Sequence, residues 1–230
     1  MAILGRLSRL LRREPVDERA DPTILAAIGT EVRERVQDHP KIQAIAGDKA
    51  DLFLLPKLLS PRQCRKLIAI IDSRIQPSVL FSETVAPKGR TSSTHFFSQD
   101  LPETRALATK ISEITGIGSH HAEPLQGQRY RAGGFYRPHY DAFDQAQESL
   151  YAQHTKRGGQ RTWTCMINLN TPIQGGATIF PKIDLTLPAE QGQLLLWNNI
   201  NTDASINLYS LHGGAEVLRG EKFIITQWFR

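Results

Sequence analysis

Cysteine pairs and long hydrophobic runs are both scarce in this sequence of 230 residues. Only two cysteines occur, Cys64 and Cys165, so a disulfide framework is not expected and two buried free thiols are. Such cysteine usage is typical of a reducing compartment, which predicts a cytoplasmic protein. No apolar stretch approaches the roughly 18 residues of a membrane-spanning helix, so no transmembrane segment is expected.

The positive charge of the chain is spread out rather than concentrated. Aromatic residues make up 7% of the sequence, and the net charge of +5 is not gathered into a dense basic stripe. A nucleic-acid partner is therefore not expected, because such partners need a concentrated basic surface. The excess charge fits an acidic substrate or an acidic partner surface as well, and the oligomeric state is left open.

The first 50 residues are predicted to form a helical extension that precedes the main domain. Leucines and arginines alternate over residues 1–11, which suits either a loosely docked terminal helix or a basic amphipathic helix on an anionic membrane. Asp21 and Pro22 are typical of a helix N-cap and first turn, and apolar residues follow at helical spacing up to Val36. A second short helix is expected to reach Ala46.

Residues 51–230 are predicted to form one α+β domain with a jelly-roll core at about residues 124–230. Ser60-Pro61 and Leu101-Pro102 mark the starts of two helices that flank the core on its N-terminal side. After Pro124 the pattern changes to short strands separated by Gly, Pro and Asn turn signals, which is typical of a β-sandwich or jelly roll. The strands expected are residues 52–55, 79–85, 91–97, 125–130, 135–140, 162–168, 178–181, 193–198, 204–212 and 222–229.

Two distant segments carry residues that suit a metal site. His139 and Asp141 are two positions apart, so on an extended strand both side chains face the same way. Such a pair alone is weak evidence, but His212 is a candidate third ligand, and two histidines with one carboxylate are the ligand set of non-haem Fe(II) oxygenases. Lys222 lies in an apolar strand and needs an anionic partner, because an unpaired buried charge costs about 3–5 kcal/mol. A bound dicarboxylate would satisfy it, and a lysine that extends its ammonium into water is the alternative.

The order of these motifs resembles the prolyl 4-hydroxylase-like branch of the 2-oxoglutarate- and Fe(II)-dependent dioxygenases. That family's pattern reads Tyr-x-x-His-x-Asp, then Gly-Gly-Gln-Arg followed by Thr, then Gly-Gly-x-Thr-x-Phe-Pro, a distal His, and a Lys before a terminal Trp. The resemblance covers roughly residues 51–230. The residues that carry it are Arg90-Thr91-Ser92-Ser93, Glu123-Pro124-Leu125-Gln126, Tyr130, Tyr136, His139, Asp141, Gly158-Gly159-Gln160-Arg161, Thr164, Gly175 to Pro181, His212, Lys222 and Trp228.

The resemblance implies a fold, a set of cofactors and a role for each matched residue. The fold is a double-stranded β-helix, and the cofactors are Fe(II), 2-oxoglutarate and O₂, with ascorbate as the reductant. His139, Asp141 and His212 would be the metal ligands. Lys222 would pair with the distal carboxylate of 2-oxoglutarate, and catalysis would depend on all four residues. Tyr130 and Thr164 would add hydroxyl hydrogen bonds to that carboxylate, and the residues that could face the substrate are Arg90, Ser92, Arg161 and Trp228.

Departures from the family pattern bear on the substrate. Ala177 stands where the family commonly has Glu, Asn168 stands where it often has Tyr, and no Pro precedes Val217. The polar segment 144–156 could be a mobile lid over the site. The leading hypothesis is hydroxylation of prolyl residues in a protein or peptide, and hydroxylation of a free amino acid or another small molecule is the alternative. A zinc hydrolase or a metal-binding jelly-roll module without turnover represents the other classes.

Overall fold

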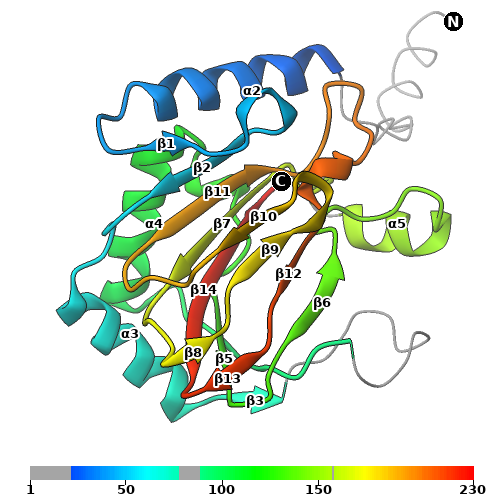
Figure 1. Cartoon of the computed structure of the whole chain (residues 1–230). Coiled ribbons are helices and arrows are strands. Elements are labelled where there is room, and N and C mark those ends of the chain that lie inside the picture. Colours follow the sequence, from blue (N-terminus) through cyan, green and yellow to red (C-terminus); the bar gives the residue numbers. More distant parts are fainter. Residues whose placement is uncertain (1–21, 78–88, 157) are drawn as a thin grey trace, which may run out of the picture.

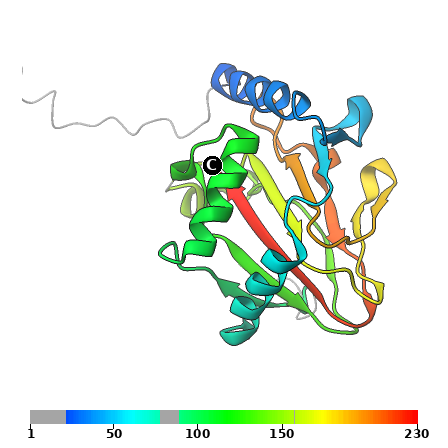
Figure 2. The same cartoon turned by 90° about the vertical axis from the view of Figure 1, so that its left-hand side faces the viewer.

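The computed structural model describes residues 22–77, 89–156 and 158–230 (Figure 1). The described residues form two main antiparallel sheets that lie face to face, and helices cover the outer face of the larger sheet (Figure 2). Within this part of the chain the larger sheet has eight strands. In order across it they are β1 (Gln43–Ala44), β2 (Leu52–Leu55), β11 (Leu194–Asn198), β7 (Trp163–Asn168), β14 (Lys222–Phe229), β5 (Gln126–Tyr130), β4 (Ser93–Phe96) and β3 (Gln76–Pro77).

The smaller sheet receives the strands that come between those of the larger sheet in the sequence. Its order is β10 (Leu185–Leu187), β9 (Thr178–Phe180), β12 (His212–Gly214) and β6 (Tyr136–His139), and a separate ribbon pairs β13 (Val217–Arg219) with β8 (Gln174–Gly175). The chain thus passes from β5 to β6, back to β7, across to β9, back to β11, across to β12 and back to β14. This alternation is the connectivity of a jelly roll, so the predicted α+β class and jelly-roll core are confirmed.

Three helices begin where the sequence signals predicted, and a fourth forms in the segment expected to be a lid. They are α2 (Pro22–Gln37), α3 (Pro61–Ser73), α4 (Pro102–Thr115) and the shorter α5 (Glu148–Thr155). The Ser60 hydroxyl accepts a hydrogen bond from the backbone N–H of Gln63, and the Gln63 side chain accepts one from the backbone N–H of Ser60, so α3 starts with a capping box. The helix α4 ends at Gly116, whose φ of 75° suits glycine at a helix C-terminus.

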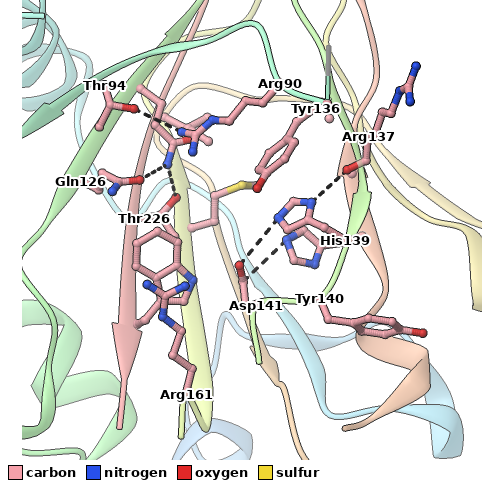
Figure 3. Close-up of a pocket in the computed structure, with 18 of the residues that line it drawn as sticks. Arg90, Thr94, Gln126, Tyr136, Arg137, His139, Tyr140, Asp141, Arg161 and Thr226 are labelled. Carbon is pink, nitrogen blue, oxygen red and sulfur yellow. Dashed lines mark hydrogen bonds and ion pairs between the residues drawn. The ribbon is translucent and has the colours of Figure 1, made fainter. Parts of the chain in front are cut away.

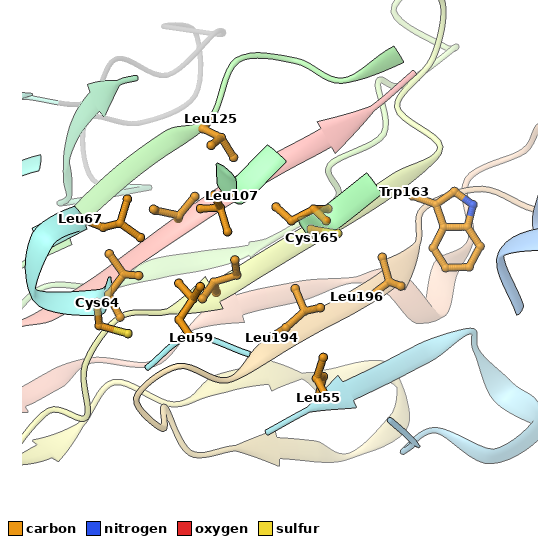
Figure 4. Close-up of a cluster of buried hydrophobic side chains, with 14 of the residues drawn as sticks. Leu55, Leu59, Cys64, Leu67, Leu107, Leu125, Trp163, Cys165, Leu194 and Leu196 are labelled. Atoms are coloured by element: carbon orange, nitrogen blue, oxygen red, sulfur yellow. The ribbon is translucent and has the colours of Figure 1, made fainter. Parts of the chain in front are cut away.

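Strand alternation separates a helix-side core from the interior between the sheets. On β7, Trp163, Cys165 and Ile167 belong to the core beneath α3 and α4, whereas Thr164 and Met166 face the smaller sheet. Both cysteines are buried and unpaired, as predicted. The labelled members of the helix-side core in Figure 4 are Leu55, Leu59, Cys64, Leu67, Leu107, Leu125, Trp163, Cys165, Leu194 and Leu196.

Two local predictions are wrong. The short helix expected to reach Ala46 is instead the strand β1, which pairs with β2, followed by a 3-10 turn at Gly47–Lys49. Residues 204–212 do not form a continuous strand, because Asn207 accepts from the backbone N–H of Tyr209 and starts a 3-10 turn at Leu208–Ser210. The strand β12 therefore begins only at His212.

Some predictions concern residues outside the described part of the chain. These are the terminal helix at residues 1–11, the N-cap at Asp21 and the strand at residues 79–85. The boundary between a segment 1–50 and a domain 51–230 stays a prediction, and β1 crosses it by pairing with β2 in the larger sheet. Among the described helices, none is long and apolar enough to cross a membrane.

Candidate active site

The pairing of β6 with β12 brings two imidazoles to the mouth of the interior between the sheets. His212 and His139 are direct partners in the register of these antiparallel strands. Asp141 follows β6, and its carboxylate oxygens lie 3.7 Å from Nε2 of His139 and 3.6 Å from Nε2 of His212 (Figure 3). One candidate ligand atom from each of the three residues lies within 4.8 Å of the others. The arrangement could hold one metal ion between two nitrogens and one oxygen.

Backbone carbonyls fix both rings in the state that a metal needs. Nδ1 of His139 lies 2.9 Å from the carbonyl oxygen of Arg137, and Nδ1 of His212 lies 2.9 Å from that of Ser210. Each Nδ1–H can therefore donate to a carbonyl, which leaves the Nε2 lone pair directed at Asp141, as is usual for metal-ligating histidines. Burial and the neighbouring His212 lower the pKa of His139 to about 3, so this ring is neutral at physiological pH.

Asp141 is held as a carboxylate by its neighbours. Burial on its own raises the pKa of this group, but His212, His139, the guanidinium of Arg161 and a hydrogen bond from Thr164 outweigh burial and lower the pKa below its usual value. The Thr164 hydroxyl donates to Oδ2 of Asp141 at 2.8 Å. That same hydroxyl accepts from Nδ2 of Asn199 at 2.8 Å, and both residues are fully buried.

These contacts correct the expected role of Thr164. The residue does not line the cavity, and its hydroxyl proton is already committed to Asp141. The hydroxyl beside the lysine belongs instead to Thr178, whose Oγ1 accepts from Nζ of Lys222 at 3.4 Å. Thr178 was part of the matched Gly-Gly-x-Thr-x-Phe-Pro motif, and its alternation with Phe180 on β9 was the available signal.

The inner end of the cavity carries a buried cation, Lys222. Lys222 is 3% exposed, and burial lowers its pKa to about 8. Within the described part of the chain, no carboxylate forms an ion pair with its ammonium. Tyr130 is the direct partner of Lys222 across β5 and β14, so the phenol lies beside the lysine on the same face of the sheet.

One cavity of about 1270 Å³ connects the histidines with Lys222. Arg161 closes one side of it, because its guanidinium stacks on Trp228 with Cζ 4.0 Å from the ring centroid. Glu123 fixes that guanidinium with hydrogen bonds of 2.6 and 2.7 Å, a role that the sequence did not reveal. The helix α5 and the turn before it supply further lining residues at Asp144, Gln147, Leu150 and His154, so the segment expected to be a lid does border the cavity.

The other side of the cavity mouth carries a second stacked pair. The guanidinium of Arg90 lies 5.0 Å from the ring centroid of Tyr136, and that ring in turn stacks on His139 at 3.7 Å. Burial raises the pKa of Tyr136 to about 12, so its hydroxyl stays protonated. Ser92 lies outside the cavity lining, and its hydroxyl accepts from Nε of Arg90. The expected substrate contact at Ser92 is thus replaced by a contact that orients Arg90.

Comparisons with known proteins assign this arrangement to a family. A family model described as the 2OG-Fe(II) oxygenase superfamily matches residues 125–230. Probable prolyl 4-hydroxylase 3 of Arabidopsis thaliana is 32% identical over 200 residues, which are 76% of this chain and 68% of the relative. Prolyl 4-hydroxylase 1 of the same plant is 31% identical over 199 residues, 78% of this chain and 68% of the relative. This chain belongs to the 2OG-Fe(II) oxygenase superfamily.

This 2OG-Fe(II) oxygenase also shares its fold with solved prolyl hydroxylases. The structure of a viral collagen prolyl hydroxylase from Paramecium Bursaria Chlorella virus-1 with 2OG matches 79% of this chain and 96% of its own, with a TM-score of 0.61 and 24% identity. The chain spans 66–68% of the length of the first Arabidopsis relatives. As a family member it is a dioxygenase that uses Fe(II), 2-oxoglutarate and O₂, in place of the zinc-hydrolase and non-catalytic alternatives.

Proposed function

We propose that this dioxygenase hydroxylates prolyl residues of a peptide or protein at C4. The observation that carries the proposal is that the metal-site residues and the buried Lys222 share one cavity, with the stacked pair of Arg161 and Trp228 on its wall. The prolyl 4-hydroxylases among its relatives support the reaction and the substrate class. The cavity of about 1270 Å³ exceeds the roughly 300–1,000 Å³ of typical small-molecule sites, which favours a peptide over a free amino acid.

In this proposal His139, Asp141 and His212 hold Fe(II). Two imidazole nitrogens and one carboxylate are the donor set that suits a non-haem iron site with open positions, and the carbonyl-bound Nδ1 atoms support both rings as ligands. When bound, Fe(II) supplies the insertion of one oxygen atom of O₂ into an unactivated C–H bond, while 2-oxoglutarate takes the other and becomes succinate and CO₂. Asp141 is kept ionised for this task by its neighbours, foremost His212, His139 and Arg161.

Lys222, Thr178 and Tyr130 form the proposed seat for the distal carboxylate of 2-oxoglutarate. The ammonium supplies the counter-charge, the Thr178 hydroxyl of the smaller sheet accepts from it, and Tyr130 of the larger sheet is its direct partner across the strands. Hydrogen bonds to charged groups contribute about 1.5–3 kcal/mol each, so this trio can select a dicarboxylate over a monocarboxylate. The same contacts would explain how a buried lysine is tolerated although none of the described carboxylates forms an ion pair with it.

The substrate would lie against aromatic and guanidinium surfaces that the structure holds rigid. Arg161 cannot swing away, because Glu123 binds it bidentately and Trp228 supports its face. Tyr136 presents a hydroxyl that stays protonated and can donate to a substrate carbonyl. Such flat walls suit a proline ring with its neighbouring peptide groups, and Arg90 lies at the same mouth.

Mass spectrometry of proline-containing peptides tests the proposal. The purified chain, given Fe(II), 2-oxoglutarate, O₂ and ascorbate, should add one oxygen atom to a prolyl residue and release one succinate per product. Amino-acid analysis of the product should give 4-hydroxyproline, and His212→Ala should give none. Faster hydroxylation of free proline than of any peptide would favour the small-molecule alternative instead.

Two finer points belong to the same proposal. We place the enzyme in the cytoplasm, which the buried, unpaired Cys64 and Cys165 support, and cell fractionation tests this location. We also expect ascorbate to act as the reductant that restores Fe(II) after turnover without substrate. When ascorbate is omitted, succinate release should start at the same initial rate but stop earlier.

A further inference from the structure

A column of polar side chains runs along the floor of the cavity, from the substrate wall to the proposed cosubstrate seat. Gln126, Gln128 and Tyr130 alternate on one face of β5, and all three line the cavity. Across the ladder to β14 they face Thr226, Ile224 and Lys222 in register. Figure 3 shows Gln126 and Thr226 on the side of the cavity opposite His139 and Asp141.

Gln128 is the central residue of this column, because both of its amide N–H donors and its carbonyl oxygen form hydrogen bonds with neighbours. Its Oε1 accepts from the Tyr130 hydroxyl at 3.1 Å. Its Nε2 donates to Oε1 of Gln126 at 3.0 Å and to Oγ1 of Thr226 at 3.3 Å. Gln128 has 4% of its surface exposed and is held by partners on both sides. A change in one of these hydrogen bonds therefore affects the others.

The phenol of Tyr130 has one proton, and in this structure the hydroxyl donates it in a hydrogen bond to Oε1 of Gln128. A carboxylate that arrives at Lys222 would therefore meet only the lone pairs of the Tyr130 oxygen. Tyr130 can donate to that carboxylate only after it leaves Gln128. Oε1 of Gln128 would then have lost this donor, and because Gln128 lines the cavity, the backbone N–H of a bound peptide can take the donor's place.

We propose that Gln128 is a positioning residue that couples peptide binding to cosubstrate binding. It does so by determining whether the Tyr130 hydroxyl donates its hydrogen bond to Gln128 or to the carboxylate of the cosubstrate. This inference depends on the proposed function, because it takes Lys222 as the cosubstrate seat. Without peptide, Gln128 competes with 2-oxoglutarate for the hydrogen bond from Tyr130, and the binding of 2-oxoglutarate is weakened. With a peptide N–H on Gln128, the proton is released to the carboxylate, and by linkage each ligand strengthens the binding of the other.

An anaerobic titration with 2-oxoglutarate tests the coupling directly. The Fe(II) enzyme with 2-oxoglutarate should develop a visible charge-transfer band, which gives the Kd without turnover. Gln128→Leu frees the Tyr130 proton, so its Kd should fall about two- to tenfold, the worth of one exchanged hydrogen bond. A saturating proline peptide should lower the Kd of the natural chain by a similar factor and leave that of Gln128→Leu unchanged.

A double-mutant cycle separates this role from a general effect on the pocket. In the Tyr130→Phe background, Gln128→Leu should no longer tighten binding, because no phenolic proton is left to release. Gln147→Leu removes another glutamine of the cavity lining, outside this column, and should leave the Kd unchanged. If Gln128→Leu does not fold, Gln128→Met, which keeps the length of the side chain, takes its place.

The outcomes distinguish the coupling from the proposed function. No charge-transfer band in the natural chain would refute the cosubstrate seat and the coupling together. A normal band, with equal Kd values for the natural chain and both Gln128 variants, would refute the coupling alone. The same holds if Gln128→Leu changes the Kd equally with Tyr130 and with Phe at that position.

Discussion

At the scale of single residues, two threonines near the site have separate tasks. The Thr164 hydroxyl holds Oδ2 of Asp141, whereas the Thr178 hydroxyl lies beside the ammonium of Lys222. Thr164→Val keeps the shape but removes that hydrogen bond, so Fe(II) affinity should fall about 10- to 100-fold, as is usual for partners of metal ligands. Competition with a chelator measures this affinity.

Thr178→Val is the matched control, since it changes the other hydroxyl in the same way. It should raise the Kd of 2-oxoglutarate and leave Fe(II) affinity as it was. If instead Thr164→Val weakens 2-oxoglutarate and not the metal, the role first expected for Thr164 would be restored.

Lys222 should lower the stability of the fold and raise its affinity for 2-oxoglutarate. Its ammonium is buried without a protein carboxylate beside it in the described residues, and replacement of such charges by apolar groups is often neutral or stabilising by about 1–4 kcal/mol. Lys222→Met should therefore keep or raise the Tm, while the Kd of 2-oxoglutarate rises on the order of ten- to a hundredfold with the loss of a charged hydrogen bond. Calorimetry and the anaerobic titration measure the two effects. A lower Tm with unchanged affinity would show that the lysine is structural.

The same lysine sets a pH dependence. Burial lowers the pKa of Lys222 to about 8, so the free enzyme carries the ammonium below that pH and loses it above. A bound dicarboxylate favours the charged form, which means that affinity for 2-oxoglutarate is fully present below about pH 8 and declines as pH rises through that value. Titrations at a series of pH values should show this decline in the natural chain. Lys222→Met should bind equally weakly across the series.

At the scale of elements, the contact of α3 with β5 supports the polar column from behind. A Cβ at Gly127 would lie 2.4 Å from Cγ1 of Ile71 on α3 and 2.9 Å from Cε2 of Phe97. Gly127→Ala should therefore overpack this contact and cost about 1–3 kcal/mol in the free energy of unfolding, measured with denaturant. Gly29→Ala in α2 is the control, because its Cβ would meet Arg33 only at an ordinary 3.5 Å, and a helical alanine should leave stability unchanged or higher.

The sequence predicted elements best where the signal was local. Ser60-Pro61 specified the start of α3, and the two-residue spacing of His139 and Asp141 specified a shared face. The sequence contains no local signal for which hydroxyl reaches Lys222, because Thr178 lies on the smaller sheet and Lys222 on the larger one. Both threonines fit the family motif, so only the packing of one sheet on the other separates them.

The same limit applies to the connections between elements. The stretch before His212 has the composition of a strand, but the side-chain oxygens of Asn207 and Asp203 accept hydrogen bonds from nearby backbone N–H groups, which turns it into irregular structure. The pairing of His212 with His139 then follows from the register of β12 on β6, which no short-range pattern contains. The role of Glu123 could likewise not be predicted, since its partners Arg161 and Arg230 are distant in the sequence.

At the scale of the whole molecule, the proposed ligands would tie the two sheets together. The histidines lie on β6 and β12 of the smaller sheet, whereas Lys222 and Tyr130 lie on β14 and β5 of the larger one. Metal and 2-oxoglutarate bound in one cavity would thus bridge two sheets that also meet through a cluster of buried apolar side chains. Binding to the folded state alone should then appear as an increase in Tm that depends on both ligands.

The size of that increase follows from mass action. A ligand at a hundred times its Kd adds about 2.7 kcal/mol to the free energy of unfolding, which for a domain of this length raises the Tm by about 5–10 °C. Under anaerobic conditions Fe(II) should give a first increase, 2-oxoglutarate a second one only when metal is present, and a chelator should reverse both. His212→Ala should lose both increases, whereas Lys222→Met should keep the first and lose most of the second. A 2-oxoglutarate effect that persists without metal, or survives in Lys222→Met, would mean that the cosubstrate binds elsewhere and that the two sheets are not joined through this cavity.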